Sequence, residues 1–129
     1  MMGHVRNLTS KEWDAVATTI DPTQPVTTLI NVFTVRPEHQ AELVALLGRA
    51  TDEVMSELPG FVSANIHAST DGVRVVNYAQ WTSAEAMRAM QANPDAQPHM
   101  AAAAAIAESF EPHLYTVESV HARESESPA

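Results

Sequence analysis

Several classes of protein are excluded by what this sequence lacks. It has no cysteine, so disulfides, zinc–thiolate sites, iron–sulfur clusters and thiol nucleophiles are impossible. Lys and Arg together number only 7, against 16 Asp and Glu, and they form no basic run. Neither a nucleic-acid backbone nor an anionic membrane surface is therefore expected as a partner.

Long apolar runs and glycine-rich loops are missing as well. The longest smooth apolar segment, Ala101 to Ile106, is far shorter than the roughly 20 residues that span a bilayer. No apolar run of signal-peptide length follows the first residues, so a soluble cytoplasmic protein is expected. The four glycines stand singly and no G-x-S-x-G motif occurs, which argues against a phosphate-binding loop and a serine-hydrolase elbow.

What is present fits one globular domain. The chain has 129 residues, of which 45% are apolar and 18% charged, and a domain of this size buries about two thirds of its unfolded surface. We expect an arm at residues 1–26, the domain at 27–121 and a flexible polar tail at 122–129. A capping box at Thr9 and Glu12, followed by apolar residues at helical spacing, predicts a short helix within the arm.

Apolar spacing predicts the order of helices and strands in the domain. Strands are expected where β-branched and apolar residues alternate, and helices where apolar residues recur every three or four positions. The expected strands are 27–35, 61–69, 73–81 and 113–121, and the expected helices are 37–58, 82–93 and 99–109. The order is β-α-β-β-α-β with the second helix broken in two. It is typical of an α+β ferredoxin-like fold, in which a four-stranded antiparallel sheet has helices on one face.

The hairpin between the second and third strands decides which of their side chains face the helices. Thr70-Asp71-Gly72 fits a three-residue loop that ends in a left-handed glycine. This register pairs His67 with Val75 and Asn65 with Asn77. The odd-numbered residues of both strands then share the face that carries the helices.

The helices would leave the other face of the sheet uncovered. Its expected side chains are almost free of charge, and they are Ile30, Val32, Val62, Ile66, Val76 and Tyr78. A second sheet packed against them would remove them from water. We therefore expect a homodimer, a dimeric α+β barrel whose two sheets form the common core.

The helix-facing side is unusually polar for a core. Its expected members include three amides, an imidazole, an indole and a phenol, namely Asn31, Asn65, Asn77, His67, Trp81 and Tyr115. Buried polar groups cost several kcal/mol unless they are paired, so the cluster suggests a cavity lined by hydrogen-bonding groups. The alternative is a network of satisfied amides that fixes the register of the strands. No metal site is predicted, because the six histidines include no H-x-x-x-H or H-x-H pair.

Three short motifs resemble those of the antibiotic biosynthesis monooxygenase family. They are Asn31-Val32-Phe33-Thr34-Val35, Pro59-Gly60-Phe61 and Val76-Asn77-Tyr78-Ala79-Gln80-Trp81. The resemblance covers residues 27–121 and implies a dimeric ferredoxin-like α+β barrel. One branch of the family contains cofactor-independent oxygenases that convert anthrones and related tricyclic or tetracyclic phenols to quinones. Membership of that branch implies that this chain needs no cofactor.

The resemblance also implies site residues. In that branch an Asn on the first strand and an Asn and a Trp on the third strand line the pocket, and they match Asn31, Asn77 and Trp81. A His on the second strand matches His67. The family's pocket Tyr and Arg find no counterpart, and Met87 stands near the place where the Tyr is expected.

These residues give a chemical hypothesis, with a planar aromatic phenol and O₂ as the partners. The N–H groups of Asn31, Asn77 and Trp81 would stabilise a substrate oxyanion, each contributing roughly 3 kcal/mol. His67 is the candidate base, and His99 is a second candidate on a loop that could act as a lid. The remaining substrate contacts are expected from Phe33, Phe61, Asn65, Met87, Met90 and Tyr115.

Two other functions stay open. Another branch of the family degrades haem with a His on the helix about ten residues past the Trp. Position 91 is Gln91 here, so His99 would have to take the place of that ligand. A barrel of this kind could also serve as a non-catalytic ligand carrier or as a polyketide cyclase.

Overall fold

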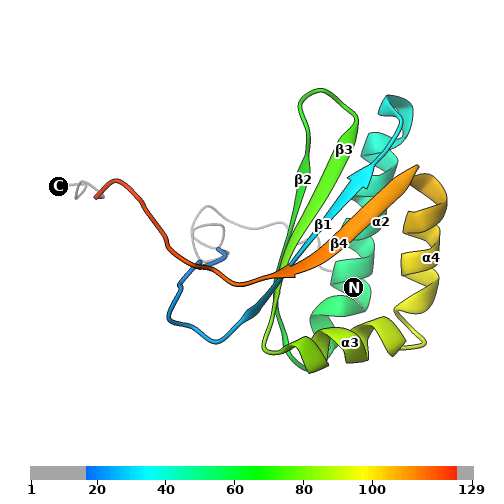
Figure 1. Cartoon of the computed structure of the whole chain (residues 1–129). Coiled ribbons are helices and arrows are strands. Elements are labelled where there is room, and N and C mark those ends of the chain that lie inside the picture. Colours follow the sequence, from blue (N-terminus) through cyan, green and yellow to red (C-terminus); the bar gives the residue numbers. More distant parts are fainter. Residues whose placement is uncertain (1–16, 125–129) are drawn as a thin grey trace, which may run out of the picture.

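The structure is a computed structural model that describes residues 17–124, and it forms two layers, a sheet and a set of helices (Figure 1). The strands are β1 (Thr27–Thr34), β2 (Phe61–Ala68), β3 (Arg74–Trp81) and β4 (Ser109–Tyr115). The α-helices are α2 (Gln40–Glu53), α3 (Ala84–Ala92) and α4 (Gln97–Ile106), and the 3-10 turns η1 (Pro37–His39) and η2 (Met55–Glu57) flank α2. The predicted order of elements, with the second helix in two parts, is confirmed.

Neighbouring strands of the sheet are antiparallel throughout. Their order is β2-β3-β1-β4, so β1 and β3 are central while β2 and β4 form the edges. The three helices lie on the same face of the sheet (Figure 1), which confirms the predicted ferredoxin-like fold. We call the other side the open face. Because side chains alternate along a strand, the register of each strand decides which residues reach the helices.

The core between sheet and helices consists of two apolar clusters. One surrounds Leu43 and Val75, neither of which has any exposed surface. The other surrounds Trp81 and includes Met87 and Met90 of α3. Complete burial of a side chain such as Leu43 stabilises the fold by about 2 kcal/mol.

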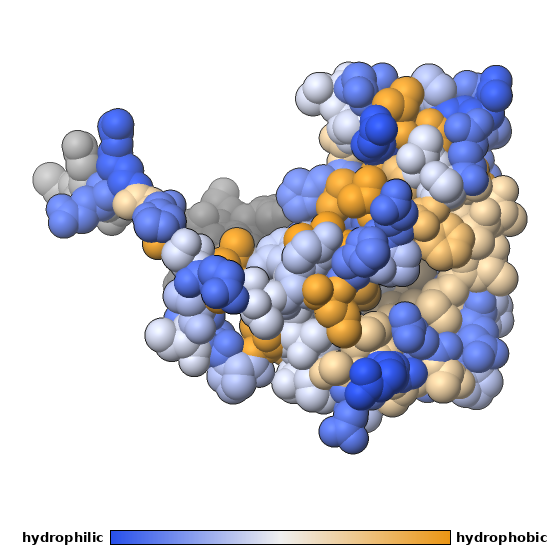
Figure 2. All heavy atoms as spheres, in the orientation of Figure 1, coloured by the Kyte–Doolittle hydropathy of each residue, from blue (hydrophilic) through white to orange (hydrophobic). Residues whose placement is uncertain are grey.

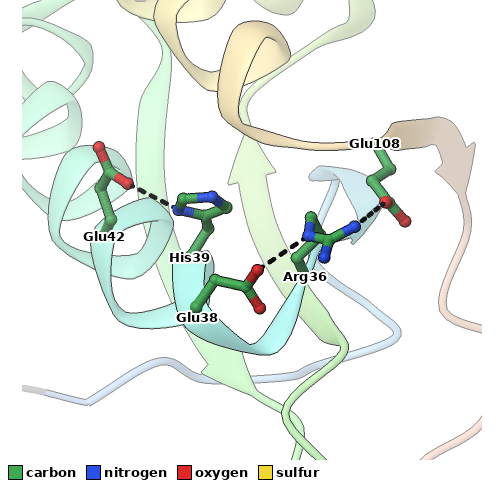
Figure 3. A network of polar contacts seen from close by, with 5 residues as sticks. All are labelled: Arg36, Glu38, His39, Glu42 and Glu108. Atoms are coloured by element: carbon green, nitrogen blue, oxygen red, sulfur yellow. Dashed lines mark hydrogen bonds and ion pairs between the residues drawn. The ribbon is translucent and has the colours of Figure 1, made fainter.

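Charged residues surround the turn from β1 into α2 (Figure 3). Arg36 Nε lies 2.9 Å from Glu38 Oε2, and Arg36 Nη1 lies 4.0 Å from Glu108 Oε2. The hydrogen bond from Arg36 lowers the pKa of the Glu38 carboxyl below its ordinary value. His39 Nδ1 lies 3.3 Å from Glu42 Oε1. These groups are exposed, and exposed pairs contribute little to stability, so we assign them to orienting the turn.

The hairpin between β2 and β3 has a longer loop than predicted. The Ser69 N–H donates to the Arg74 carbonyl at 3.0 Å, so Ser69 pairs with Arg74 rather than with Val73. The Asp71 carboxylate holds this loop, because it accepts from the Ser69 hydroxyl at 2.7 Å and from the Val73 N–H at 3.2 Å. The predicted three-residue loop is therefore wrong.

Because of the longer loop, the side chains in the middle of β2 point to the opposite faces from those predicted. His67 pairs with Val76 and Asn65 pairs with Tyr78, each one position away from the predicted partner. A slip of one residue sends every side chain to the opposite face. His67 and Asn65 therefore lie on the open face, and the prediction that they face the helices is wrong. Ile66, predicted on the open face, packs in the core instead.

A β-bulge at the start of β2 restores the alignment of its first residue. The register shifts between Phe61 and Ser63, with Phe61 opposite Trp81. Val62 is the extra residue of the bulge and is 44% exposed. For this reason Phe61 faces the helices as predicted, although the odd-numbered Asn65 does not.

Strand β4 begins earlier than predicted. It spans Ser109–Tyr115, and residues 116–124 have no regular secondary structure, so the predicted strand at 113–121 is wrong over most of its length. Pro112 lies inside β4, which is tolerated because β4 is an edge strand. The register places Tyr115 opposite Thr28, hence on the open face, and the prediction that Tyr115 faces the helices is also wrong.

All three α-helices begin at a residue other than the predicted one, and α2 begins at Gln40, after the 3-10 turn that Pro37 opens. Helix α3 begins at Ala84 rather than at residue 82, and its N-cap is Ser83, whose hydroxyl accepts from the Ala86 N–H at 3.0 Å. Helix α4 begins at Gln97, so His99 lies in its first turn rather than on a loop. Within residues 17–124 no helix is long and apolar enough to cross a membrane.

The segment that precedes β1 contacts the open face. The Thr18 hydroxyl donates to Asn65 Oδ1 at 2.6 Å, and Gln80 Nε2 donates to the Thr19 carbonyl at 2.9 Å. Most of the predicted N-terminal helix lies outside the described residues, and residues 17–20 at its end are not helical.

Candidate active site

A cavity of about 190 Å³ lies between the helix-facing side of the sheet and the helices. All four strands contribute to its lining, as do α2, α3 and α4. Figure 2 shows the surface hollowed between the apolar side chains of β4 and the alanine-rich α4. An apolar cavity of about 150 Å³ is enough to hold benzene, so this one has room for an aromatic ring.

Asn31 and Asn77 are direct partners across β1 and β3, and both line the cavity. Oδ1 of each side chain is buried without a hydrogen-bond partner, and so is Nε1 of Trp81. Leaving such a group unpaired costs about 1–3 kcal/mol, and folded proteins rarely do so. The other such atom among residues 17–124, Thr28 Oγ1, lies on the open face. Three unpaired atoms on residues that line one cavity indicate a site that a ligand completes.

Trp81 is held in place by its packing. It is the last residue of β3, is 2% exposed, and meets the ring of Phe61 edge-on, with centroids 5.5 Å apart and planes at 88°. Aromatic pairs favour this arrangement. Because the indole N–H can only donate, the fixed ring presents a donor with no acceptor of its own.

The walls of the cavity are apolar. Phe33, Phe61 and Met90 line it, as expected from the sequence. Met55, Met100 and Phe110 also line it and were not singled out. Phe110 was missed because its strand was placed too late in the sequence.

Three polar side chains join the lining from the helices, namely Thr51, Gln91 and His99. Apart from His99, none of the lining side chains is ionisable. The Thr51 hydroxyl donates to the Leu47 carbonyl at 2.9 Å, so its oxygen can still accept a hydrogen bond. Thr51 was not predicted, although a hydroxyl on the apolar stripe of α2 is a signal that could have found it.

Four residues expected at the site lie elsewhere. His67 is exposed on the open face, and its Nδ1 lies 3.2 Å from the Asn65 carbonyl oxygen. Asn65 is bound to Thr18 and, through Nδ2, to the Tyr78 carbonyl. Tyr115 is exposed, and Met87 is buried without lining the cavity. The structure brings together the other seven, which are Asn31, Asn77, Trp81, Phe33, Phe61, Met90 and His99.

The part of the chain that the structure describes contains no group of three His, Asp or Glu side chains placed to hold a metal ion. A ligand in the cavity would therefore meet neutral dipoles, one imidazole and apolar walls. Such a lining suits a planar aromatic molecule whose oxygen atoms need hydrogen-bond partners.

Comparison with known proteins agrees with this description. A family model described as antibiotic biosynthesis monooxygenase matches residues 27–105. Tetracenomycin-F1 monooxygenase from Streptomyces glaucescens is 52% identical over 81 residues, which cover 63% of this chain and 72% of that protein. The region matched by the family model includes both asparagines, the indole and His99 of the cavity.

Two solved structures are similar in fold and in sequence. The monooxygenase from the gene ActVA-Orf6 of Streptomyces coelicolor, in complex with nanaomycin D, has a TM-score of 0.69 and 32% identity, and the match covers 80% of this chain and 96% of that one. SnoaB from Streptomyces nogalater, described as a cofactor-independent oxygenase, has a TM-score of 0.66 and 29% identity, covering 74% and 96%.

Proposed function

Because the chain belongs to the antibiotic biosynthesis monooxygenase family, we propose that it is a cofactor-independent monooxygenase that oxidises a polycyclic aromatic polyketide to a quinone with O₂. The substrate is an anthrone- or naphthacenone-type phenol. The names of the relatives support this, since one is a tetracenomycin-F1 monooxygenase, one is a cofactor-independent oxygenase and one binds nanaomycin D.

The single observation that carries the proposal is the set of unpaired atoms in an apolar cavity. Asn31 Oδ1, Asn77 Oδ1 and Trp81 Nε1 are buried without partners, and the surrounding walls are largely apolar. A polycyclic phenol matches both the apolar walls and the unpaired polar atoms. Its rings fill the apolar space, and its oxygens complete the hydrogen bonds.

In the proposed reaction the substrate supplies the electrons that a cofactor supplies elsewhere. A CH₂ group between two rings loses a proton to a base, and the charge spreads onto the ring oxygens. The anion transfers one electron to O₂, the two radicals combine to a peroxide anion at that carbon, and the base returns its proton to give a hydroperoxide. Loss of water then leaves C=O, so one atom of O₂ enters the quinone and the other leaves as water.

The two amides and the indole stabilise the anion in this scheme. Asn31 and Asn77 can each present an N–H to the cavity by a half-turn of the amide, and the Trp81 indole has a buried N–H without an acceptor. Donors that are fixed before the charge develops are more effective than water, because they need no reorganisation. Losing one such donor typically costs about 3 kcal/mol.

His99 is the proposed base. It is the ionisable side chain of the cavity lining, whereas His67 lies on the open face. Histidine is the side chain that most often accepts protons in active sites. Its place in the first turn of α4 puts the ring on a helix rather than on a mobile lid.

The protein is further proposed to act as a homodimer in the cytoplasm. Ile30, Val32 and Val76 share the open face, and Tyr115 on the same face is 47% exposed. Packing against the sheet of a second copy would bury these side chains and form the α+β barrel. The dimer and the location remain predictions.

An oxygenase assay tests the function. Purified protein treated with a metal chelator is incubated with an anthrone under air, and the quinone is followed by its absorbance. The proposal expects quinone far faster than without protein, with one oxygen atom from ¹⁸O₂. A rate equal to the protein-free control contradicts it and leaves a carrier or cyclase. Haemin titration checks the haem-degrading alternative, which requires a shift of the Soret band on binding.

A further inference from the structure

Three of the methionines surround the proposed reaction site. Met55 of η2, Met90 of α3 and Met100 of α4 line the cavity, and we call them the cavity methionines. Met90 is only 8% exposed. A thioether is the side chain most easily converted to a sulfoxide by a peroxide, so these sulfur atoms line the space where the proposed reaction makes one.

We propose that the cavity methionines form an oxygen-accepting site that is oxidised to methionine sulfoxide by the enzyme's own peroxide intermediate. This inference rests on the proposed function. It assigns to the three thioethers a role as targets of a side reaction, in addition to their role as apolar walls.

The side reaction competes with formation of the quinone. On the main path the peroxide loses its C–H proton and a hydroxide, which leave as water. On the side path the thioether sulfur attacks the outer peroxide oxygen, the O–O bond breaks and an S=O bond forms. The proton of the outer oxygen moves to the oxygen that remains on carbon, so the substrate leaves as an alcohol. Sulfur is oxidised and the peroxide is reduced, and no further reactant is needed.

The consequence is inactivation that depends on turnover. A sulfoxide is polar and replaces a flexible apolar side chain in the wall. Met90 also packs in the core cluster that contains Trp81, so its oxidation disturbs the indole that is proposed to bind the anion. Methionine sulfoxide reductases reverse this modification.

Met87 provides a matched control within the same helix. It precedes Met90 by one helical turn, is 5% exposed and packs in the same cluster, but it does not line the cavity. Both methionines are poorly exposed, at 5% and 8%, although Met90 also lines a second pocket beside Pro59 and Gly60. Of this pair, Met90 lines the cavity and Met87 does not, so peroxide that is held in the cavity reaches Met90 but not Met87.

The test uses peptide mapping by mass spectrometry in two arms. In the first arm the protein turns over an anthrone under ¹⁸O₂. In the second, no substrate is present, and cumene hydroperoxide serves as the peroxide because it carries a single aromatic ring, for which the cavity has room. In both arms we expect about tenfold more sulfoxide at Met90 than at Met87, because oxidation follows access to the oxidant. In the first arm the sulfoxide carries the heavy oxygen.

Each outcome decides one part of the inference. Equal oxidation of Met87 and Met90 by cumene hydroperoxide overturns the oxygen-accepting site. Quinone formation without labelled sulfoxide overturns its link to turnover. Failure to form quinone counts against the proposed function alone, since the second arm still tests the site. Met90→Leu is expected to complete more turnovers before inactivation than the native protein, and Met87→Leu is expected to match the native protein.

Discussion

Asn31 and Asn77 face each other across the β1–β3 ladder, and the side-chain oxygen of each is buried without a partner. Directly opposite residues of antiparallel strands have Cβ atoms about 4.5–5.5 Å apart, so the two amides reach the same atoms of a guest. Both strands are central in the sheet, and their ladder hydrogen bonds fix the pair. The arrangement binds an oxygen atom without any change of the backbone.

Removing either amide should slow the reaction without unfolding the protein. Asn31→Ala and Asn77→Ala should each lower kcat about a hundredfold, the usual loss for one oxyanion donor. Asn65→Ala is the control, since this amide lies on the open face, where it is bound to Thr18 and to the Tyr78 carbonyl. Steady-state rates with an anthrone measure the effect. Equal rates for Asn65→Ala and Asn77→Ala would show that the cavity asparagines take no part in the mechanism.

The indole should act through its N–H rather than through its ring. Trp81→Phe keeps an aromatic ring that can pack edge-on against Phe61 but deletes the unpaired donor. We expect kcat to fall by roughly tenfold to a hundredfold, and the melting temperature to fall because the smaller ring leaves a gap in the core, with the protein still folded at the assay temperature. Circular dichroism and the rate assay together measure this. Full activity in the variant shows that the N–H contributes nothing.

Replacement of the two candidate bases should affect kcat very differently. His99 lines the cavity and His67 does not, so His99→Ala should lower kcat by about a hundredfold or more, while His67→Ala should keep the native rate. Deuterium at the reacting CH₂ group adds a second measurement. In His99→Ala removal of that proton should limit the rate, and the isotope effect should exceed that of the native protein. Loss of activity in His67→Ala instead would contradict the register described for β2.

The loop of the β2–β3 hairpin should make stability depend on pH. Hydrogen bonds from Ser69 and Val73 lower the pKa of Asp71 below its ordinary value of 3.8. The ionised carboxylate therefore stabilises the folded state above about pH 4, and this contribution is lost as the pH falls through the lowered pKa. Asp71→Asn should be less stable than the native protein at pH 7, with a difference that shrinks towards pH 3. Urea unfolding at each pH measures it.

A double-mutant cycle controls for the partner of Asp71. Replacing Ser69 by Ala removes the hydroxyl that donates to Asp71 at 2.7 Å. Asp71→Asn should therefore lower the free energy of unfolding less in the Ser69→Ala protein than in the native protein. If the difference in stability between the native protein and Asp71→Asn stayed constant from pH 7 to pH 3, the carboxylate would not titrate as described.

The order of elements could be predicted from the sequence because the spacing of apolar residues reports which face of each element is buried. The positions of Asn31, Asn77 and Trp81 followed from β1 and β3, since alternation alone determines the faces of these two strands. The turns into the helices were also near their predicted places.

The β2 side chains that face the helices could not be predicted, because the register of this strand depends on loop contacts that the sequence pattern does not reveal. The hydrogen bonds of Ser69 and Asp71 add one residue to the loop and turn His67 to the open face. The bulge at Val62 then turns Phe61 back towards the helices. Strand β4 was predicted at 113–121 but begins at Ser109, and Pro112 is tolerated because β4 is an edge strand. The earlier start places Phe110 in the lining of the cavity.

The central claim is that the unpaired groups of the cavity bind the oxygen atoms of an aromatic guest. The most direct measurement is the ¹⁵N–¹H spectrum of the two tryptophan side chains, titrated with a soluble anthraquinone sulfonate. The signal lost in Trp81→Phe identifies the Trp81 indole. We predict that this signal moves downfield on binding, as its N–H gains an acceptor. A signal that stays unchanged at saturating ligand would contradict the account.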